Sequence, residues 1–339
     1  MELRYRRGPS DPAGAFSYAA ILRPLTDTQD GPRRLIRLQG SKMIAVTCAT
    51  GRTGRRVTEI LLAKGEKVRA VGRDPKKLAP LTGLGAEPFV GNVEDASLVT
   101  EAFADVIAVY LVLPEDLSQQ DLRAHQERVS DCYAAAIKSA QVRFAVNLSS
   151  IGAQHAEGTG PIVGLHNQEQ KLSRVDGLNV LHLRAAYFME NLFMSMAPLR
   201  ATGTLPGGMR GDAPMPWIAT KDIGAYAANR LVARDFSGSS IQELHGPRDI
   251  SMNEAASIVG KAVGRPDITY LQVPSPTLEA TLLRMGLPKR TAELIIEMWD
   301  GANAGLIVPQ EARSARNTTS TTLESFVTEV FVPAYLQMA

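Results

Sequence analysis

The stretch MIAVTCATGRTGRRV, residues 43–57, constrains the fold of this chain more than any other segment. Its first residues are apolar and suit a buried strand, and its later residues suit a helix. Between them, Cys48, Gly51 and Gly54 occupy the positions of a G-x-x-G-x-x-G turn, with cysteine in place of the first glycine. Glycines in such a turn allow a tight bend, close approach of backbone N–H groups to a pyrophosphate, and close helix–strand packing. The stretch therefore predicts a dinucleotide-binding turn.

Apolar runs and amphipathic helical patterns alternate from residue 43 to residue 191. We expect strands at 43–49, 67–73, 86–91, 105–114, 143–150 and within 177–191. We expect helices at 53–65, 74–85, 95–104, within 118–140 and near 169–175. This βαβα series predicts an α/β fold with a doubly wound parallel sheet.

The pattern changes after about Asn191, where segments become longer, more helical and richer in Met, Pro and Gly. We expect 43–190 to form mainly the nucleotide-binding core and 191–339 to form mainly a smaller lobe. That lobe is expected to include a helix at 220–233 and a strand at 240–246.

Residues 1–42 carry eight Lys or Arg, four acids and four prolines, without a hydrophobic period. They are expected to be a disordered extension, either a dispensable tail or a segment upstream of a natural start at Met43. A targeting or nucleic-acid-binding arm is the alternative, which the four acids weaken. Subtracting these charges from the totals of 37 basic and 35 acidic residues leaves 29 and 31 for the rest of the chain. This mildly acidic body does not suit a general nucleic-acid surface.

The two cysteines, Cys48 and Cys132, form no CxxC pair, which argues against a disulfide framework and against a zinc site. They fit a reducing cytosol, and we expect a cytoplasmic protein. The longest apolar run, 106–113, is too short to span a bilayer, and the N-terminus lacks the pattern of a signal peptide.

The end of the second expected strand indicates which dinucleotide is bound. Sites that prefer NAD place an acid there for the ribose 2′-OH, whereas this chain has Arg73, and Arg52 lies inside the turn. A cation at this place favours a 2′-phosphate, so NADP(H) is expected ahead of NAD(H). The alternative is a surface arginine that pairs locally with Asp74.

Other cofactor contacts are expected where strands end, because ligands of such sheets lie at the carboxyl ends of the strands. Asn92 follows the third strand and is expected to bind adenine. Asn147, Ser149 and Ser150 end the fifth strand, toward the nicotinamide. The full expected cofactor set is Thr47, Ala49, Thr50, Gly51, Arg52, Thr53, Gly54, Arg73, Asn92, Leu113, Pro114 and Ser149.

The chain resembles NmrA-like proteins, which are atypical short-chain dehydrogenases/reductases. The resemblance rests on TCATGRTGRRV, VGRDPKKL, NLSSIGA, HNQEQKLSRVDGLNVLHLRAAYFMENL, PWIATKDIGAYAANRLV and ELHGPRDISMNEAASIVGKAVGR, which occur in the family's order from Met43 onward. It implies a Rossmann domain with a small C-terminal lobe that binds NADP(H) or NAD(H). The family includes quinone and azo-compound reductases, and also NADP-sensing regulators with little or no catalysis.

Two features depart from the wider superfamily. Cys48 replaces a glycine, and the segment GPIVGLHNQEQKLS, residues 160–173, holds no Tyr-x-x-x-Lys pair, whose tyrosine gives the proton in reductases. His166, Glu169 and Lys171 are the strong polar candidates there. His166 either protonates or orients a substrate or is a surface histidine, and Glu169 is expected to be mainly structural.

The resemblance implies that Tyr187, Phe188 and Asn191 line the nicotinamide and substrate pocket. We take His166 and Tyr187 as the catalytic candidates, and we expect no metal site. Cys48 is expected to be a small space-filler rather than a redox-sensitive thiol whose pKa the helix N-terminus lowers, and the turn should tolerate it if its φ is not strongly positive.

Two functions fit these observations. The first is an NAD(P)H-dependent oxidoreductase that passes a hydride to quinone-like or other conjugated, electron-poor small molecules. The second is a non-catalytic sensor of NADP(H) that acts through a protein partner. A homodimer is compatible with both, whereas neither involves a membrane or direct nucleic-acid binding.

Overall fold

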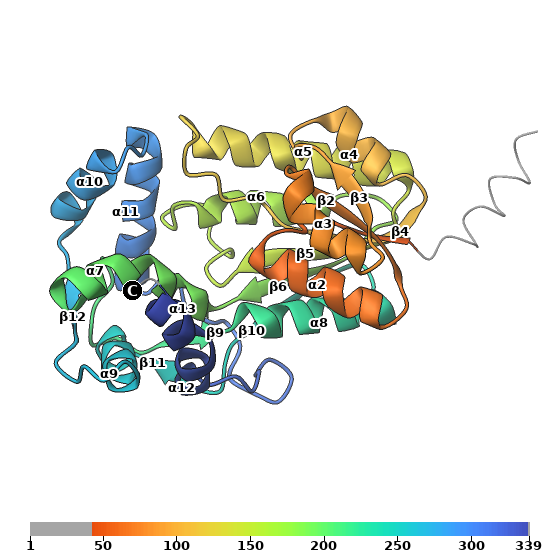
Figure 1. Cartoon of the computed structure of the whole chain (residues 1–339). Coiled ribbons are helices and arrows are strands. Elements are labelled where there is room, and N and C mark those ends of the chain that lie inside the picture. The colour runs from red at the N-terminus through yellow and green to blue at the C-terminus, as the bar shows by residue number, and fades with distance from the viewer. Residues whose placement is uncertain (1–42, 338–339) are drawn as a thin grey trace, which may run out of the picture. The chain divides into compact units, whose positions relative to one another are not determined.

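The computed structural model describes residues 43–337 (Figure 1). The extension expected at 1–42 lies outside the described residues. Within residues 43–337, no helix combines the length and the apolar character needed to cross a bilayer.

A parallel sheet of seven strands forms the centre of this part of the chain, and it confirms the predicted fold class. Its order is β10-β6-β5-β4-β1-β2-β3. The strands are β1 (Met43–Val46), β2 (Lys67–Gly72), β3 (Glu87–Val90), β4 (Val106–Leu111), β5 (Phe144–Ser150), β6 (Asn179–Ala185) and β10 (Ser239–Leu244). Strand order reverses between β1 and β4, and open sheets of this kind bind ligands outside the carboxyl ends of the strands at that reversal.

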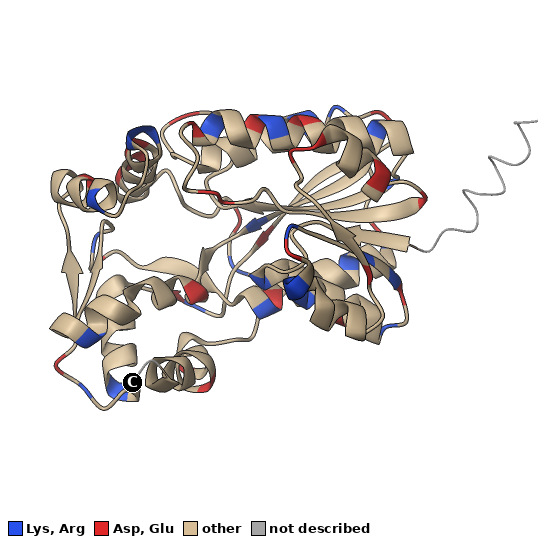
Figure 2. Ribbon diagram, turned by 45° about the horizontal axis from the view of Figure 1, so that its top comes forward, with Lys and Arg blue, Asp and Glu red and all other residues tan. Residues whose placement is uncertain are grey.

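Alternation of side chains along β1 feeds two hydrophobic layers. Ile44 and Val46 face the layer that helices α2, α3 and α8 cover, whereas Ala45 faces the layer that α4, α5 and α6 cover (Figure 1). These helices are α2 (Arg52–Ala63), α3 (Pro75–Gly83), α8 (Thr220–Ala233), α4 (Ala96–Ala102), α5 (Leu122–Ala140) and α6 (Ile162–Leu172). Charged residues of both signs lie along the helices, while the strands are largely uncharged (Figure 2).

A third core, built around the fully buried Trp217, holds the lobe together. Two small sheets belong to it, one of order β11-β9-β7 and one of order β12-β8. The strands are β7 (Tyr187–Phe188), β8 (Thr204–Gly207), β9 (Met215–Ile218), β11 (Asp249–Ile250) and β12 (Thr269–Gln272). The helices are η1 (Met189–Ser195), α7 (Met196–Thr202), α9 (Met252–Ala262), α10 (Ser275–Arg284), α11 (Lys289–Asn303), α12 (Leu323–Phe326), η2 (Val327–Phe331) and α13 (Val332–Gln337).

The placement of α8 and β10 in the lobe was wrong. β10 pairs with β6 in the main sheet, from Ser239 opposite Val180 to Leu244 opposite Ala185, and α8 packs against α2. A helix followed by a strand has the same local pattern in either part of a chain, so no local pattern indicates that the chain returns to the core. The expected helix near 169–175 also differs, because α6 begins at Ile162, within a glycine-rich segment that weakened its pattern.

Candidate functional site

The glycine turn joins β1 to α2 at the carboxyl edge of the sheet. Its backbone closes through a hydrogen bond of 2.8 Å from Gly51 N to Cys48 O. A methyl group at Gly54 would collide with that same carbonyl, so only glycine lets the helix approach so closely. This is the close helix–strand packing that a glycine of such a turn allows.

Cys48 adopts φ of +48°, in the left-handed region, so the condition under which the turn was expected to tolerate a cysteine is not met. The turn forms all the same, at a cost of about 1–2 kcal/mol for a residue with a Cβ. Burial raises the pKa of the Cys48 thiol to about 11, against the opposing charge of Arg73. A raised pKa argues against the redox-sensitive thiol and is in keeping with a space-filling role for Cys48.

The first turn of α2 is built for an anion. Its N-cap residue, Gly51, offers no side-chain acceptor, and the turn contains no acid. Instead, Arg52 and Arg55 lie there. Cations near a helix N-terminus oppose the helix dipole, and free N–H groups there need acceptors. A bound pyrophosphate would accept hydrogen bonds from these N–H groups and would offset the positive charge of the arginines. The residues present therefore fit a dinucleotide.

The remaining turn residues support this geometry. Ala49 is fully buried and its N–H donates to Val71 O at 2.9 Å, which ties the turn to the end of β2. Thr53 is also buried. Thr50 lies next to Gly72, because a Cβ added at Gly72 would meet Thr50 Cγ2 at 3.4 Å.

Arg73 directly follows β2, and its side chain is 68% exposed. Its guanidinium lies 3.9 Å from Asp116 Oδ2. It does not pair with Asp74, whose carboxylate instead accepts the Lys76 N–H at 2.8 Å and caps α3. The local pairing considered from the sequence is therefore absent, and the exposed Arg73 instead lies within ion-pair distance of Asp116, which follows β4.

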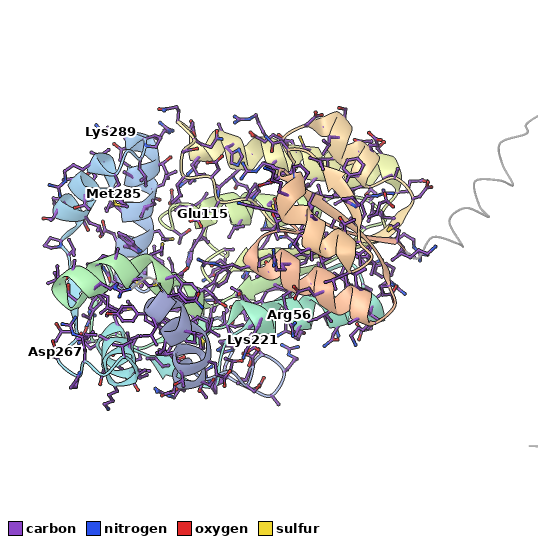
Figure 3. The ribbon with its side chains drawn as sticks, viewed as in Figure 1. Arg56, Glu115, Lys221, Asp267, Met285 and Lys289 are labelled. Carbon is purple, nitrogen blue, oxygen red and sulfur yellow. The ribbon has the colours of Figure 1, made fainter. Side chains whose placement is uncertain are left out.

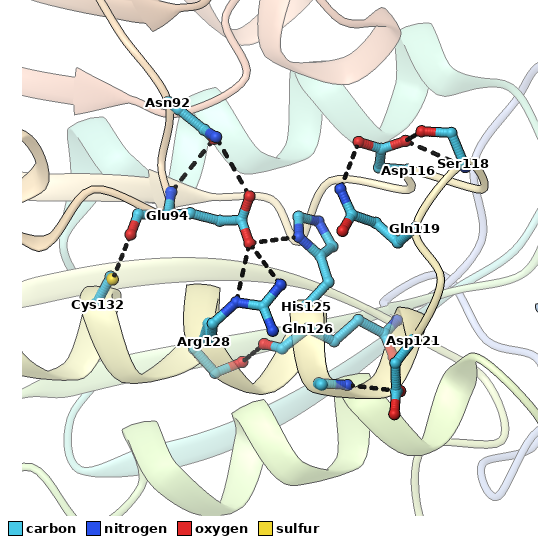
Figure 4. A network of polar contacts seen from close by, with 12 residues as sticks. Asn92, Glu94, Asp116, Ser118, Gln119, Asp121, His125, Gln126, Arg128 and Cys132 are labelled. Carbon is cyan, nitrogen blue, oxygen red and sulfur yellow. Dashed lines mark hydrogen bonds and ion pairs between the residues drawn. The ribbon is translucent and has the colours of Figure 1, made fainter.

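Asn92 belongs to a polar network that the sequence did not reveal (Figure 4). Its amide donates to Glu94 Oε2 at 3.2 Å, and Glu94 Oε1 lies 2.9 Å from His125 Nδ1 and 3.0 Å from an Arg128 nitrogen. Desolvation would raise the pKa of Glu94, but hydrogen bonds from His125, Arg128 and Asn92 hold it below its usual range. Asn92 is thus oriented after β3, although no signal in the sequence pointed to its partners on α5.

Two side chains that were expected to contact the cofactor form hydrogen bonds within the protein instead. Thr47 Oγ1 donates to Tyr110 O and accepts from Val112 N, both at 3.0 Å, so it joins β1 to β4. Ser149 Oγ donates to Glu169 Oε1 at 2.5 Å. Glu169 in turn pairs with Arg184 at 2.7 Å, and both are nearly inaccessible. Glu169 is held in an internal ion pair, and the hydroxyl protons of Thr47 and Ser149 are already donated to partners within the protein.

The chain leaves β4 over the carboxyl edge through Leu113 and Pro114. Leu113 is buried in the layer with α5. The next residue, Glu115, lies on the side of the sheet that faces α11 (Figure 3). Desolvation by the surrounding protein raises the pKa of the Glu115 carboxyl, and the positive charge of Arg52 opposes this rise. Glu115 is a further polar group of the site that sequence reasoning missed.

Each of the two catalytic candidates has contacts of its own within the protein. His166 Nδ1 lies 2.8 Å from Ala153 O, so Nδ1 carries the proton and Nε2 is left as the acceptor of the neutral ring. Tyr187 packs edge-to-face on Trp217, with ring centroids 4.8 Å apart. Burial raises the pKa of Tyr187 to about 12, against a hydrogen bond from Asn191. Tyr187 is therefore a neutral hydrogen-bond donor at physiological pH.

A separate cavity of about 530 Å³ lies between Gly158 and helices α10 and α11. Four of its lining residues are acidic, namely Glu279, Glu293, Glu297 and Asp300. This lining repels phosphates and includes no residue of the glycine turn, so the cavity is not the dinucleotide site. Among residues 43–337, no cluster of His, Cys, Asp and Glu could hold a metal ion.

Comparison with known proteins decides the family. The sequence profile of the NmrA-like family matches residues 40–326. The chain belongs to the NmrA-like family. This NmrA-like chain is 27% identical over 267 residues to prestalk A differentiation protein A of Dictyostelium discoideum, covering 76% of this chain and 82% of that protein. It is 26% identical over 265 residues to the uncharacterized oxidoreductase YesF of Bacillus subtilis, covering 77% and 85%.

Solved structures of similar fold include both enzymes and a regulator. The NADPH-dependent quinone oxidoreductase QOR2 of Escherichia coli, complexed with NADPH, superposes with a TM-score of 0.72 at 24% identity, over 85% of this chain and 100% of that one. NmrA, a negative transcriptional regulator in complex with NAD, superposes with a TM-score of 0.66 at 18% identity, over 88% and 98%. At these identities the likeness establishes the shared fold of the NmrA-like family.

Proposed function

We propose that this NmrA-like protein is an NADPH-dependent oxidoreductase that reduces quinone-like or other conjugated, electron-poor small molecules. The observation that carries the proposal is the first turn of α2, where Arg52 and Arg55 lie and where no acid and no N-cap side chain takes up the free N–H groups. The fold shared with QOR2, a quinone oxidoreductase bound to NADPH, supports it.

Each part of the dinucleotide has residues suited to it. The turn from Cys48 to Gly54 offers backbone N–H groups to the pyrophosphate. Arg73 follows β2 and suits the 2′-phosphate, and Asn92, held by Glu94, follows β3 and suits the adenine. When bound, NADPH supplies the hydride.

The chain contributes orientation more than proton transfer. Tyr187 holds a neutral hydroxyl that can donate a hydrogen bond to a substrate oxygen, and Asn191 orients it. His166 presents Nε2 as an acceptor because Nδ1 is bound to Ala153 O. A quinone suits such a site, because its reduced anion is comparatively stable and needs less help from a dedicated acid.

A sensor of NADP(H) that acts through a protein partner is the second candidate. It is favoured by α6, which carries no Tyr-x-x-x-Lys pair, and by His166, whose ring is tied to the backbone. The shared fold with the regulator NmrA is consistent with it. In that case the same turn binds the dinucleotide, and no acceptor is reduced.

The test is consumption of NADPH by the full chain with a panel of quinones and azo dyes, against a blank without protein. Binding of NADPH is measured in the same samples. Turnover with a quinone supports the oxidoreductase, and Tyr187→Phe should then lower turnover while leaving the NADPH dissociation constant unchanged. Clear binding without turnover on any acceptor supports the sensor, and failure to bind either dinucleotide contradicts both.

We further propose a reducing, cytosolic setting, in keeping with the free thiols of Cys48 and Cys132. Residues 1–42 are proposed to be dispensable for dinucleotide binding. Comparing NADPH dissociation constants of the full chain and of a chain without residues 1–42 tests that proposal.

A further inference from the structure

A stack of aromatic rings runs from η1 into the C-terminal helices. Phe193 of η1 stacks on Phe331, with centroids 6.0 Å apart and planes 10° apart. Phe331 stacks in turn on Tyr335, at 6.1 Å and 14°. Phe326 also contacts Phe193, at 6.0 Å and 56°. The rings therefore form a continuous column and not a set of isolated contacts.

An arginine covers each end of this column. The guanidinium of Arg52, in the glycine turn, lies 5.9 Å from the Phe193 ring centroid. At the far end the guanidinium of Arg200 lies 4.9 Å from the Tyr335 ring centroid, and its NH1 donates to Tyr335 O at 2.9 Å. Cations over aromatic faces are attracted by the ring quadrupole. The column thus links the dinucleotide turn to the last described helix of the chain.

The helix that supplies the column changes its geometry at this place. Residues Val327–Phe331 form a π-helical turn between α12 and α13. In an α-helix, residues five apart such as Phe326 and Phe331 would point roughly 140° apart. The i→i+5 bonding of a π turn brings them nearer to one face. This lets both rings contact Phe193.

We propose that Phe193, backed by this column, is a positioning residue that holds Arg52 at the phosphate end of the dinucleotide site. The helix dipole disfavours a cation at the start of α2, and a long exposed arginine would otherwise sample many rotamers. The ring restricts Arg52 to the edge of the turn. The segment Leu323–Gln337 therefore contributes to cofactor affinity without touching the cofactor, and this inference rests on the proposed dinucleotide binding.

The test compares NADPH dissociation constants of the wild-type chain, Phe193→Leu and Phe193→Tyr. Leucine keeps an apolar side chain but removes the ring, so binding should weaken about two- to five-fold, the range expected of an exposed cation–π contact. Tyrosine keeps the ring and should restore binding. In an Arg52→Gln background, Phe193→Leu should have no further effect, because both changes remove the same contact.

A matched control lies at the opposite edge of the sheet. Arg143 lies 5.7 Å from the ring centroid of Phe144, at the first residue of β5. Phe144→Leu removes a contact of the same kind away from the carboxyl edge, and it should leave the NADPH dissociation constant unchanged. Equal weakening by Phe144→Leu and Phe193→Leu would mean a general loss of stability and would overturn the inference.

Hydrogen exchange gives a second readout that needs no variant at Phe193. Coupling between two sites is reciprocal, so NADPH should slow amide exchange in residues 326–331 of the wild-type chain. Arg52→Gln should remove this protection. Unchanged exchange on NADPH binding, or wild-type affinity in Phe193→Leu, overturns the inference and leaves dinucleotide binding intact. Absence of NADPH binding by the wild-type chain would instead overturn the proposed function.

Discussion

Helices α2 and α8 lie side by side on one face of the sheet, yet they begin in opposite ways (Figure 1). The contact is close, because a Cβ at Gly224 of α8 would lie 2.7 Å from Arg56 Cβ of α2. Neither helix has a capping side chain at its N-cap residue. At α8 a buried carboxylate from elsewhere fills that role, since Glu190 accepts from Thr220 N at 3.0 Å and from Thr220 Oγ1 at 2.5 Å.

The first turn of α2 receives no such carboxylate from the described part of the chain and carries arginines instead. Free N–H groups at a helix start need acceptors in either case. At α8, whose start is buried, the chain itself supplies the anion that accepts from the N–H groups. At α2, whose start lies at the carboxyl edge, we expect a ligand to supply it. One element serves both helices, because η1 gives Glu190 to α8 and Phe193 to Arg52 of α2.

The largest effect is expected from Gly54→Ala, which disrupts the start of α2. The added methyl group collides with the Cys48 carbonyl, which is backbone and cannot rotate away. The turn must shift, and stability should fall by about 1–3 kcal/mol. Displacing several N–H donors from a charged phosphate should weaken NADPH binding about 100-fold or more. Titration of NADPH and urea unfolding measure the two effects.

Gly83→Ala is the matched control for that substitution. Gly83 lies at the end of α3, and a Cβ there meets no atom within 4 Å. Binding should be unchanged, and stability should stay equal or rise by up to about 1 kcal/mol. Wild-type affinity in Gly54→Ala would show that close approach at the turn does not matter for the dinucleotide.

Arg73→Asp tests which anion the α2 edge receives. Exchange of this exposed guanidinium for a carboxylate, beside Asp116, should weaken NADPH binding about 10- to 100-fold through the lost charge-assisted contact. NADH has no 2′-phosphate, so its dissociation constant should change little. Lys64→Asp, at the far end of α2, alters the net charge equally and should leave both affinities unchanged. Equal weakening for NADPH and NADH would exclude Arg73 as the 2′-phosphate ligand.

Glu190→Gln tests the α8 side. The amide keeps the size of the side chain but removes the charge that accepts from Thr220, so the free energy of unfolding should fall by about 2 kcal/mol. Glu329→Gln is the control. The Glu329 side chain is 62% exposed and its carboxylate lies 3.9 Å from Lys221 Nζ, and Lys221 belongs to the first turn of α8. That change should cost less than about 1 kcal/mol. Equal losses in the two variants would mean that burial of the carboxylate is not what stabilises α8.

The two helix starts also mark what the sequence could predict. The turn, α2, the first six strands and the position of Arg73 followed from local patterns, since each depends on residues close together in the chain. The cap of α8 did not, because Glu190 and Thr220 are brought together by the fold of the lobe. The same holds for Thr47 and Ser149, whose partners Val112 and Glu169 lie on other elements. A motif could suggest that these side chains bind a ligand, but only the packing shows that their hydrogen bonds are already used.

Cys48→Gly is expected to have the smallest effect, and it asks whether the imperfect turn of α2 matters. Glycine removes the cost of φ at +48°, about 1–2 kcal/mol, but adds about 0.5–1 kcal/mol of unfolded-state entropy. The variant should therefore be stabilised by at most about 1.5 kcal/mol in urea unfolding, with NADPH affinity unchanged. Arg234 follows α8 and has φ of +49°. If relief of backbone strain alone sets the change in stability, Arg234→Gly should be stabilised by a similar amount. Weaker NADPH binding in Cys48→Gly alone would mean that the thiol shapes the turn for its ligand.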